Sequence, residues 1–123
     1  MKILIIEDVD IQAKTEKLMM QSICKDAQID TADSCEAARD KVAQTPYDII
    51  LFDFGLPDGD GLELVKEFRE QGSTAYMHAV SGNYDAVPLE EQQAAGLNGG
   101  CRKPLSLDKA QEIINNYHNT HQE

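Results

Sequence analysis

Short apolar runs alternate along the chain with longer segments in which apolar residues recur every three or four positions. The short runs predict buried strands, and the longer segments predict amphipathic helices. The expected strands cover residues 2–7, 28–32, 48–53, 75–80 and 99–102, and the expected helices cover residues 11–25, 33–44, 61–71, 86–95 and 107–117. Five strand–helix units predict a five-stranded parallel sheet, doubly wound, with helices on both faces. Because crossovers are right-handed, we expect the flavodoxin-like strand order 2-1-3-4-5.

Polar residues and glycines mark the expected helix ends. Asp10 and Ser106 are suited to N-cap positions, and the Asp33–Glu36 segment resembles a capping box. Glycines at positions 72 and 96 predict helix stops. Apolar residues fall at helical spacing in the first helix (Ile11, Leu18, Met19, Ile23) and in the last (Leu107, Ala110, Ile113, Ile114, Tyr117). The polar end, residues 118–123, is expected to be frayed.

Length and charge limit the classes of protein that remain. With 123 residues we expect one domain over residues 1–123, which is enough chain to bury a core. The net charge is −11, with 22 acidic and 11 basic residues, and this excess predicts no binding to nucleic acid or anionic lipid. No stretch approaches a membrane span, and the opening apolar run is too short for a signal peptide. Three cysteines without CxxC spacing favour a reducing, cytoplasmic compartment.

Charged residues stand directly after three of the predicted strands. Glu7 and Asp8 follow the first strand, Asp53 follows the third, and Lys103 follows the fifth. Because the carboxyl ends of parallel strands meet at one edge of the sheet, we expect these side chains to converge. Two of these features have an ordinary interpretation as well: Glu7 and Asp8 as a solvated or helix-capping acid pair, and Lys103 as a salt-bridged lysine. The charge of Asp53, directly after an apolar strand, is costly unless it is paired. Together they predict a site for a divalent metal and a phosphoryl group.

The chemistry of this cluster follows from its residue types. Like-charge repulsion among the acids would be relieved by Mg²⁺, which prefers hard oxygen ligands. We expect Asp8, Asp53 and the backbone carbonyl of Gly55 as ligands, with Glu7 acting through water. Lys103 suits a phosphoryl oxygen as a mobile cation, and the hydroxyl of Ser81, at the end of the fourth strand, could donate to the same oxygen. These groups predict phosphoryl transfer to an aspartate.

The motifs resemble those of response-regulator receiver domains over essentially the whole chain. They are Ile5-Ile6-Glu7-Asp8, Ile50-Leu51-Phe52-Asp53, Leu56-Pro57-Asp58-Gly59, Gly61, Ser81-Gly82, Ala95-Gly96 and Lys103-Pro104. The resemblance implies that Asp53 accepts a phosphoryl group from a histidine kinase or a phosphotransfer protein, that Glu7 and Asp8 bind Mg²⁺, and that Ser81 and Lys103 sense the phosphoryl group. Such a domain promotes its own phosphorylation and dephosphorylation without being an enzyme in the usual sense, and it acts through a downstream partner or onward transfer. The resemblance also predicts a cis peptide between Lys103 and Pro104.

One position departs from the family pattern. Receivers usually carry a Tyr or Phe three residues before the lysine and use it as an inward-turning switch, but this chain has Gly100 there. The nearest aromatics, Tyr76 and Tyr84, lie elsewhere in the pattern. We therefore expect a void or open groove behind Ser81, a mobile segment 82–100, and an output that does not run through an aromatic side chain.

Two other interpretations are weighed against the receiver. A pseudo-receiver would fold without being phosphorylated, but such domains usually lack one of the site residues that are all present here. An aspartate-nucleophile phosphatase of the haloacid-dehalogenase type needs a second aspartate two residues after the first, and that position is Gly55. A receiver excised from a hybrid kinase and one that stands alone both fit the motifs.

Overall fold

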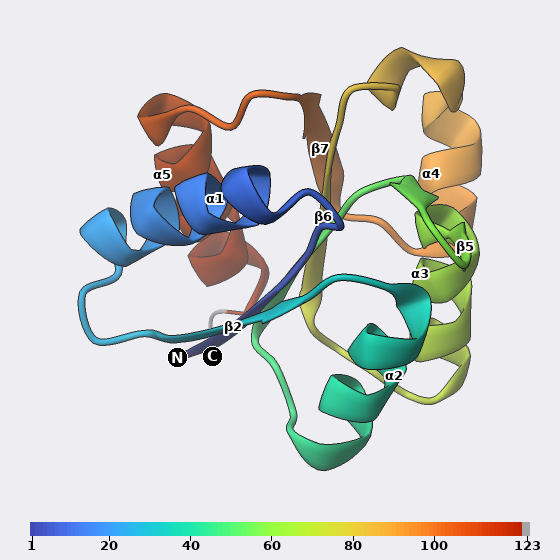
Figure 1. The fold of residues 1–123 in the computed structure, drawn as a ribbon, viewed down its shortest axis with the longest axis horizontal. Coiled ribbons are helices and arrows are strands. Elements are labelled where there is room, and N and C mark those ends of the chain that lie inside the picture. The colour runs from blue at the N-terminus through green and yellow to red at the C-terminus, as the bar shows by residue number, and fades with distance from the viewer. Residues whose placement is uncertain (122–123) are drawn as a thin grey trace.

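A five-stranded parallel sheet forms the centre of the computed structural model, which describes residues 1–121 (Figure 1). Its strands are β1 (Lys2–Ile6), β2 (Gln28–Ala32), β3 (Ile49–Phe52), β6 (Tyr76–Ser81) and β7 (Gly99–Arg102), in the order β2-β1-β3-β6-β7. A separate two-stranded hairpin pairs β4 (Gly55–Leu56) with β5 (Gly59–Asp60). The helices are α1 (Asp10–Ile23), α2 (Cys35–Gln44), α3 (Gly61–Glu70), η1 (Tyr84–Ala86, a 3₁₀ turn), α4 (Leu89–Ala95) and α5 (Leu107–Thr120). The predicted flavodoxin-like fold and strand order are confirmed.

Helices cover both faces of the sheet, as the alternation of β and α segments predicts (Figure 1). Helices α1 and α5 pack on one face, where Met20 and Ile113 meet Ile3 and Ile5 of β1. Helices α2, α3 and α4 pack on the other, where Phe68 of α3 belongs to the same cluster as Leu4 and Ile6 of β1. The central strands are therefore apolar on both sides, as strands buried in a parallel sheet must be.

Strand register brings the site residues to one edge. Ile6, the last residue of β1, pairs with Phe52, the last residue of β3, and Phe52 pairs with Ala79 of β6. The backbone N–H of Asp53 donates to the carbonyl of Ile6 at 3.2 Å, so the residues after the two strands are neighbours. The parallel register thus places the first acidic pair beside Asp53.

Two predicted helix starts are wrong in detail. The N-cap of α1 is Val9, and Asp10 is the first helical residue rather than the cap. The cap of α2 is Ser34, whose hydroxyl accepts from the N–H of Ala37 at 3.0 Å. The free N–H groups of Cys35 and Glu36 donate to the Asp58 carboxylate. A residue distant in sequence therefore caps the helix start, where a local capping box was expected.

Three other predicted helix boundaries are confirmed, whereas the helix expected over residues 86–95 is divided into η1 and a shorter α4. Gly72 and Gly96 follow α3 and α4 with φ of 93° and 111°, a left-handed backbone that favours glycine. Ser106 caps α5 by accepting from the N–H of Lys109 at 3.1 Å. Helix α5 continues through residue 120, beyond the expected start of fraying at 118, and residues 122–123 of that expected tail lie outside the described part of the chain.

The apolar residues of α1 do not all face the core. Ile11 and Leu18, seven positions apart on one side of the helix, are 69% and 71% exposed. The buried face carries Ala13, Glu16 and Met20 instead. Both faces of the helix show the same helical spacing in the sequence. The buried face was not predicted because it carries a small residue, Ala13, and a charged one, Glu16. An exposed apolar stripe therefore runs along α1.

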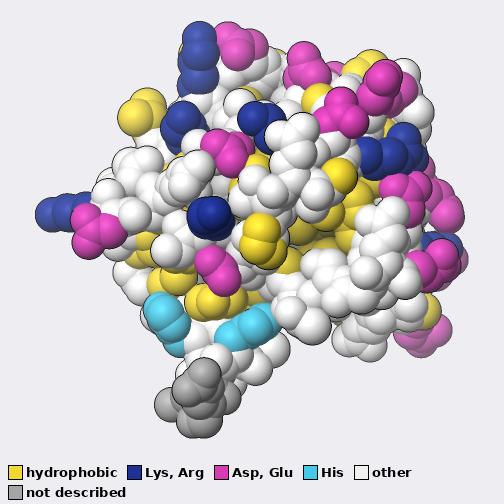
Figure 2. All heavy atoms as spheres, turned by 90° about the horizontal axis from the view of Figure 1, so that it is seen from below, with side chains coloured by type: hydrophobic (Ala, Val, Ile, Leu, Met, Phe, Trp, Pro, Cys, Tyr) yellow, Lys and Arg dark blue, Asp and Glu magenta, His cyan; other side chains and the backbone are white. Residues whose placement is uncertain are grey.

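The underside of the molecule carries mixed charge. Figure 2 shows this view from below, with apolar side chains visible in a hollow and Lys and Arg side chains standing apart among Asp and Glu.

Within residues 1–121, every helix is either too short or too polar to pass through a lipid bilayer.

Candidate functional site

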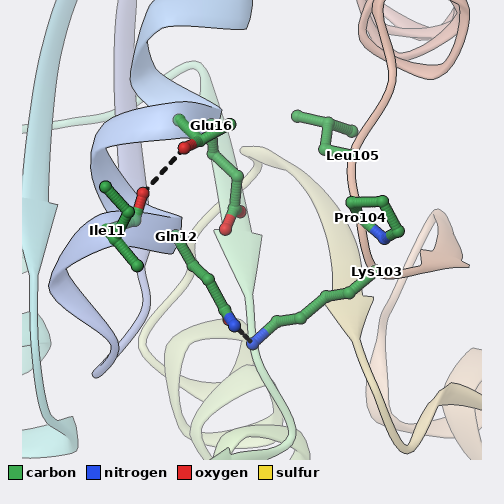
Figure 3. A pocket seen from close by; sticks show the side chains of 7 residues that line it. Ile11, Gln12, Glu16, Lys103, Pro104 and Leu105 are labelled. Carbon is green, nitrogen blue, oxygen red and sulfur yellow. Dashed lines mark hydrogen bonds between the residues drawn. The ribbon is translucent and has the colours of Figure 1, made fainter.

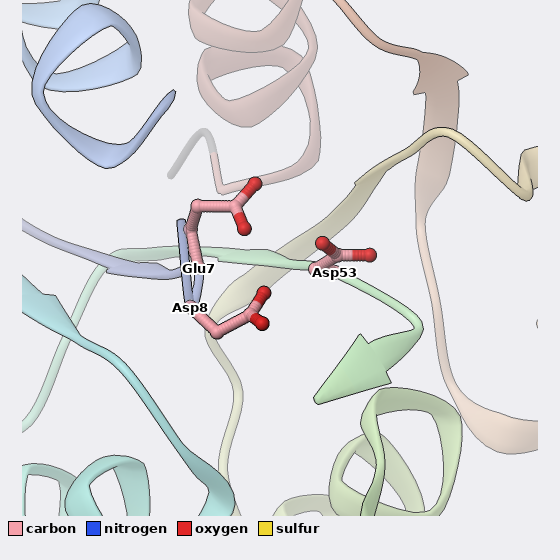
Figure 4. Close-up of side chains that lie close together, drawn as sticks. All are labelled: Glu7, Asp8 and Asp53. Carbon is pink, nitrogen blue, oxygen red and sulfur yellow. The ribbon is translucent and has the colours of Figure 1, made fainter. Parts of the chain in front are cut away.

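Three carboxylates converge at the carboxyl edge of the sheet (Figure 4). Glu7 and Asp8 follow β1, Asp53 follows β3, and one carboxylate oxygen from each lies within 4.8 Å of the others. Glu7 and Asp53 are buried, with 2% and 7% of their surface exposed, whereas Asp8 is open to solvent. The predicted convergence of the acidic residues is present in the structure.

Both oxygens of the Asp53 carboxylate have defined partners. The Ser81 hydroxyl donates to Oδ1 at 2.9 Å, and the backbone N–H of Gly55 donates to the same oxygen at 3.2 Å. Lys103 Nζ donates to Oδ2 at 2.7 Å. These contacts fix the carboxylate with one edge toward Ser81 and the other toward the cation, beside a solvent-open Asp8.

Lys103 connects the three strand ends. Its Nζ pairs with Glu7 as well as with Asp53, and it donates to Gln12 Oε1 at 2.6 Å. Its backbone N–H donates to the carbonyl of Ser81 at 3.2 Å, and the Lys103–Pro104 peptide is cis, as predicted. Burial lowers the pKa of the lysine, but hydrogen bonds and charge from Asp53 and Glu7 outweigh it and raise the pKa above its ordinary value.

Glu7 lies deeper than the other acids. Burial raises the pKa of its carboxyl against the opposing effect of the Lys103 hydrogen bond and of the Val9 N–H, which donates to Oε2 at 3.1 Å. Three acids and one lysine leave the cluster with an excess of negative charge if all are ionised. An additional cation would offset this excess.

The donor set fits a hard divalent cation. The converging atoms are all carboxylate oxygens, the ligands that Mg²⁺ prefers, and exposure at Asp8 leaves room for the waters that Mg²⁺ retains. Glu7 and Asp53 both form ion pairs with Lys103, so the cluster already binds one positive charge. The carbonyl of Gly55, two residues after Asp53, belongs to the β4 strand of the hairpin next to the site.

Helix α3 approaches the backbone of Asp53 very closely. Gly61 is its first residue and donates its N–H to the carbonyl of Phe54 at 2.9 Å. A Cβ on Gly61 would lie only 1.9 Å from the backbone oxygen of Asp53. The missing side chain at position 61 therefore lets the helix start against the backbone that carries Asp53.

A groove of about 350 Å³ borders the site between α1 and the segment after β7 (Figure 3). It is lined by Ile11, Gln12, Thr15, Glu16, Lys103, Pro104 and Leu105. Burial raises the pKa of Glu16 to about 8, with a further contribution from the charge of Glu7. The groove therefore combines an apolar wall with the same lysine that contacts Asp53.

Sequence reasoning missed three residues near the site. Gln12 and Glu16 lie one turn apart on α1, and the buried positions Ala13 and Met20 could have marked Glu16 as inward-facing. The third is Tyr84, whose ring fills the space beside Gly100: a Cβ built on Gly100 would be 2.3 Å from Tyr84 Cε1. The expected void at Gly100 is therefore wrong, because a side chain from η1 occupies the space that β7 leaves.

Known proteins resemble this chain in sequence and in fold. The family model described as "Response regulator receiver domain" matches residues 3–115. Sensor protein EvgS of Escherichia coli (strain K12) is 31% identical over 90 residues, 73% of this chain and 8% of that protein's length. Two-component response regulator ORR41 of Oryza sativa subsp. japonica is 29% identical over 115 residues, 92% of this chain and 91% of the relative. A response regulator receiver domain (CheY-like) from Methylobacillus flagellatus superposes with a TM-score of 0.85, 27% identity, and coverage of 94% and 97% of the two chains.

Proposed function

Because this chain belongs to the response regulator receiver domain family of two-component systems, we propose that Asp53 accepts a phosphoryl group from a phosphohistidine on a histidine kinase or a phosphotransfer protein. The supporting observation is the Asp53 carboxylate, held between Ser81 and Lys103 beside two further acids. Such a carboxylate is a positioned nucleophile with cationic and hydroxyl groups on either side.

The chemical step exchanges one bond to phosphorus for another. An oxygen of the Asp53 carboxylate attacks the phosphorus, and the P–N bond to the donor imidazole breaks. The electron pair of that bond stays on the imidazole nitrogen, which takes up a proton, and Asp53 becomes an acyl phosphate. Little covalent assistance is needed, since positioning and charge neutralisation supply most of the catalysis of phosphoryl transfer.

Lys103 and Ser81 are the groups placed to follow the phosphoryl group. Lys103 Nζ already lies on Asp53 Oδ2, so a small movement lets it donate to an incoming phosphoryl oxygen. The Ser81 hydroxyl, now on Oδ1, can exchange that oxygen for a phosphoryl oxygen. Both contacts would strengthen as negative charge arrives, which favours the phosphorylated state.

Glu7, Asp8, Asp53 and the Gly55 carbonyl are the residues that would hold Mg²⁺. When bound, the ion would neutralise charge shared by the carboxylates and the phosphoryl oxygens. With the ion bound, Lys103 would no longer be the single cation that offsets the negative charges of Glu7 and Asp53.

The direct test of this function is phosphorylation by acetyl phosphate with Mg²⁺, read by intact mass. A phosphate-sized gain of mass is expected, with acetate as the leaving group. No gain, in a protein that melts cooperatively, would favour the pseudo-receiver instead.

Magnesium is expected to stabilise the fold. At about a hundred times its dissociation constant, a ligand that binds only the native state adds roughly 2.7 kcal/mol to the free energy of unfolding. Thermal melts in EDTA and in excess Mg²⁺ measure the shift. The Asp8→Ala variant should lose it, and Asp10→Ala, at an exposed acid outside the cluster, should keep it. Equal shifts in both variants would remove Asp8 from the site.

The donor protein is proposed to dock on the groove beside Lys103. Its imidazole must come within bonding distance of Asp53, and the groove and the exposed stripe of Ile11 and Leu18 are the apolar surface next to that point. A net charge of −11 disfavours nucleic acid as a partner. Onward transfer, or binding of a downstream protein, would use the phosphorylated form.

Ile11→Asp is expected to separate docking from chemistry. It should slow phosphotransfer from a phosphorylated phosphotransfer protein by at least about tenfold, the effect of losing roughly 1.4 kcal/mol of binding free energy. Uptake from acetyl phosphate should not change, because that donor needs no docking surface. Leu89→Asp, at a 62% exposed leucine on α4, is the matched control and should transfer normally. Equal rates for the two variants would place the docking surface elsewhere.

A further inference from the structure

Tyr84 lies on the backbone of β7 at the position where that strand has no side chain. A Cβ built on Gly100 would be 2.3 Å from its Cε1, 3.0 Å from its Cζ and 3.1 Å from its hydroxyl. Contacts this short leave no room for any residue but glycine while the ring is there. Tyr84 itself is only partly buried, so the ring rests on β7 with one side toward solvent.

The ring also packs against the residue that follows the proposed phosphoacceptor. Tyr84 and Phe54 are stacked, with centroids 6.2 Å apart and an angle of 6° between their planes. Phe54 is buried and directly follows Asp53. Tyr84 therefore lies against both the segment that carries Asp53 and the strand that leads to Lys103.

Ser81 links the same ring to the acceptor through hydrogen bonds. Its hydroxyl donates to Asp53 Oδ1 at 2.9 Å and accepts from the backbone N–H of Asn83 at 3.2 Å. Asn83 directly precedes Tyr84 and η1. A change in the partner of the Ser81 hydroxyl therefore acts on the backbone one residue before the ring.

From these contacts we infer that Tyr84 is the residue through which the state of Asp53 reaches the surface, an inference that rests on the proposed phosphorylation of Asp53. When the Ser81 hydroxyl turns from Oδ1 to a phosphoryl oxygen, its contact with the Asn83 N–H changes. Turn η1 then shifts, and the ring leaves its position between Phe54 and Gly100. An aromatic side chain does carry the signal, and it comes from η1 rather than from β7.

The buried Gln92 side chain donates its amide N–H to the carbonyl of Val87 at 2.8 Å, so we expect the movement to be confined to residues 82–87. Turn η1 has no buried residue, and its ion pair between Asp85 and Arg102 is on the surface. Beyond α4 the chain is fixed: the Gly96 carbonyl accepts from Arg69 at 2.8 Å, and the Asn98 side chain accepts from the Met77 N–H at 2.9 Å. The segment expected to respond is therefore shorter than the 82–100 that the sequence suggested.

Fluorine NMR of protein labelled with 3-fluorotyrosine tests this inference. The chain has four tyrosines, and Tyr→Phe variants assign their signals. On addition of beryllofluoride with Mg²⁺, the Tyr84 signal should shift or change in intensity. Tyr47, whose hydroxyl donates to Asp30 at 2.6 Å away from the site, is the internal control and should not change.

A pair of glycine variants tests the contact itself. Gly100→Ala should displace the ring, so its Tyr84 signal should be shifted without beryllofluoride and should change little on addition. Gly99→Ala, at the preceding residue of β7, would direct its Cβ toward His78 and Tyr76 instead of Tyr84, so the Tyr84 signal and its response to beryllofluoride should match wild type. An unchanged Tyr84 signal in wild-type protein that still gains phosphate from acetyl phosphate would overturn the switch and leave the phosphoacceptor role intact. Absence of any phosphate gain would overturn both.

Discussion

Gly61→Ala should both destabilise the protein and slow its phosphorylation, although alanine is the better helix former. The added Cβ would lie 1.9 Å from the backbone oxygen of Asp53, 2.9 Å from its carbonyl carbon and 3.2 Å from the Cα of Phe54. All three atoms are backbone, so no side chain can rotate away to relieve the contact. Either α3 or the segment that carries Asp53 must move.

The expected sizes follow from the two consequences of that movement. Overpacking of this kind costs about 3 kcal/mol of unfolding free energy. It outweighs the advantage of roughly 1 kcal/mol that alanine has over glycine in a helix. A displacement of Asp53 by as little as about 1 Å can slow a positioned reaction on the order of 100-fold. Chemical denaturation and the rate of uptake from acetyl phosphate measure the two effects separately.

The control for this variant is Lys66→Ala, at an exposed position of the same helix. The φ angle of Gly61 is not positive, so the backbone conformation does not require glycine there. Glycine is required by the lack of space for a side chain. A Gly61→Ala protein with wild-type stability and a wild-type rate of uptake would contradict the close approach between α3 and the backbone of Asp53.

Patterns that are local in the sequence predicted most of the fold and the ionic site. Apolar strands that end in charged residues located Glu7, Asp8, Asp53 and Lys103, because parallel strands must bring their carboxyl ends to one edge. Strand register places the residues after β1 and β3 side by side, because Ile6 and Phe52 are paired neighbours. No contact between distant side chains had to be known.

Contacts between segments far apart in sequence were beyond such patterns. The N–H groups at the start of α2 bind Asp58, more than twenty residues away, so no local capping signal describes them. Likewise, the missing side chain at Gly100 leaves a void only if no other residue fills the space. Tyr84, which comes from another element, fills it. Helical spacing alone could not tell the exposed Ile11 from the buried Glu16 on α1.

Asp53→Asn is expected to abolish phosphorylation while preserving the fold. Asparagine keeps the shape and an oxygen that can accept from Ser81 and the Gly55 N–H, but its amide is not a nucleophile. Lys103 retains Glu7 as an ionic partner, so the cation is not left alone. Loss of a nucleophile costs on the order of 1,000-fold or more in rate.

The matched control is Asp58→Asn, at an exposed acid in the same loop. Asp58 accepts from the N–H groups of Cys35 and Glu36 through its two carboxylate oxygens, and asparagine keeps one of these acceptors. This variant should therefore fold with a small loss of stability and take up phosphate at the wild-type rate, and it would reveal Asp58 if that residue were the true acceptor.

Intact mass after incubation with acetyl phosphate and Mg²⁺ is the most direct test that Asp53 is the phosphoacceptor. Wild-type protein and Asp58→Asn should each gain one phosphate-sized mass, EDTA should prevent the gain, and Asp53→Asn should show none. An Asp53→Asn protein that gains the same mass at the wild-type rate would contradict the assignment.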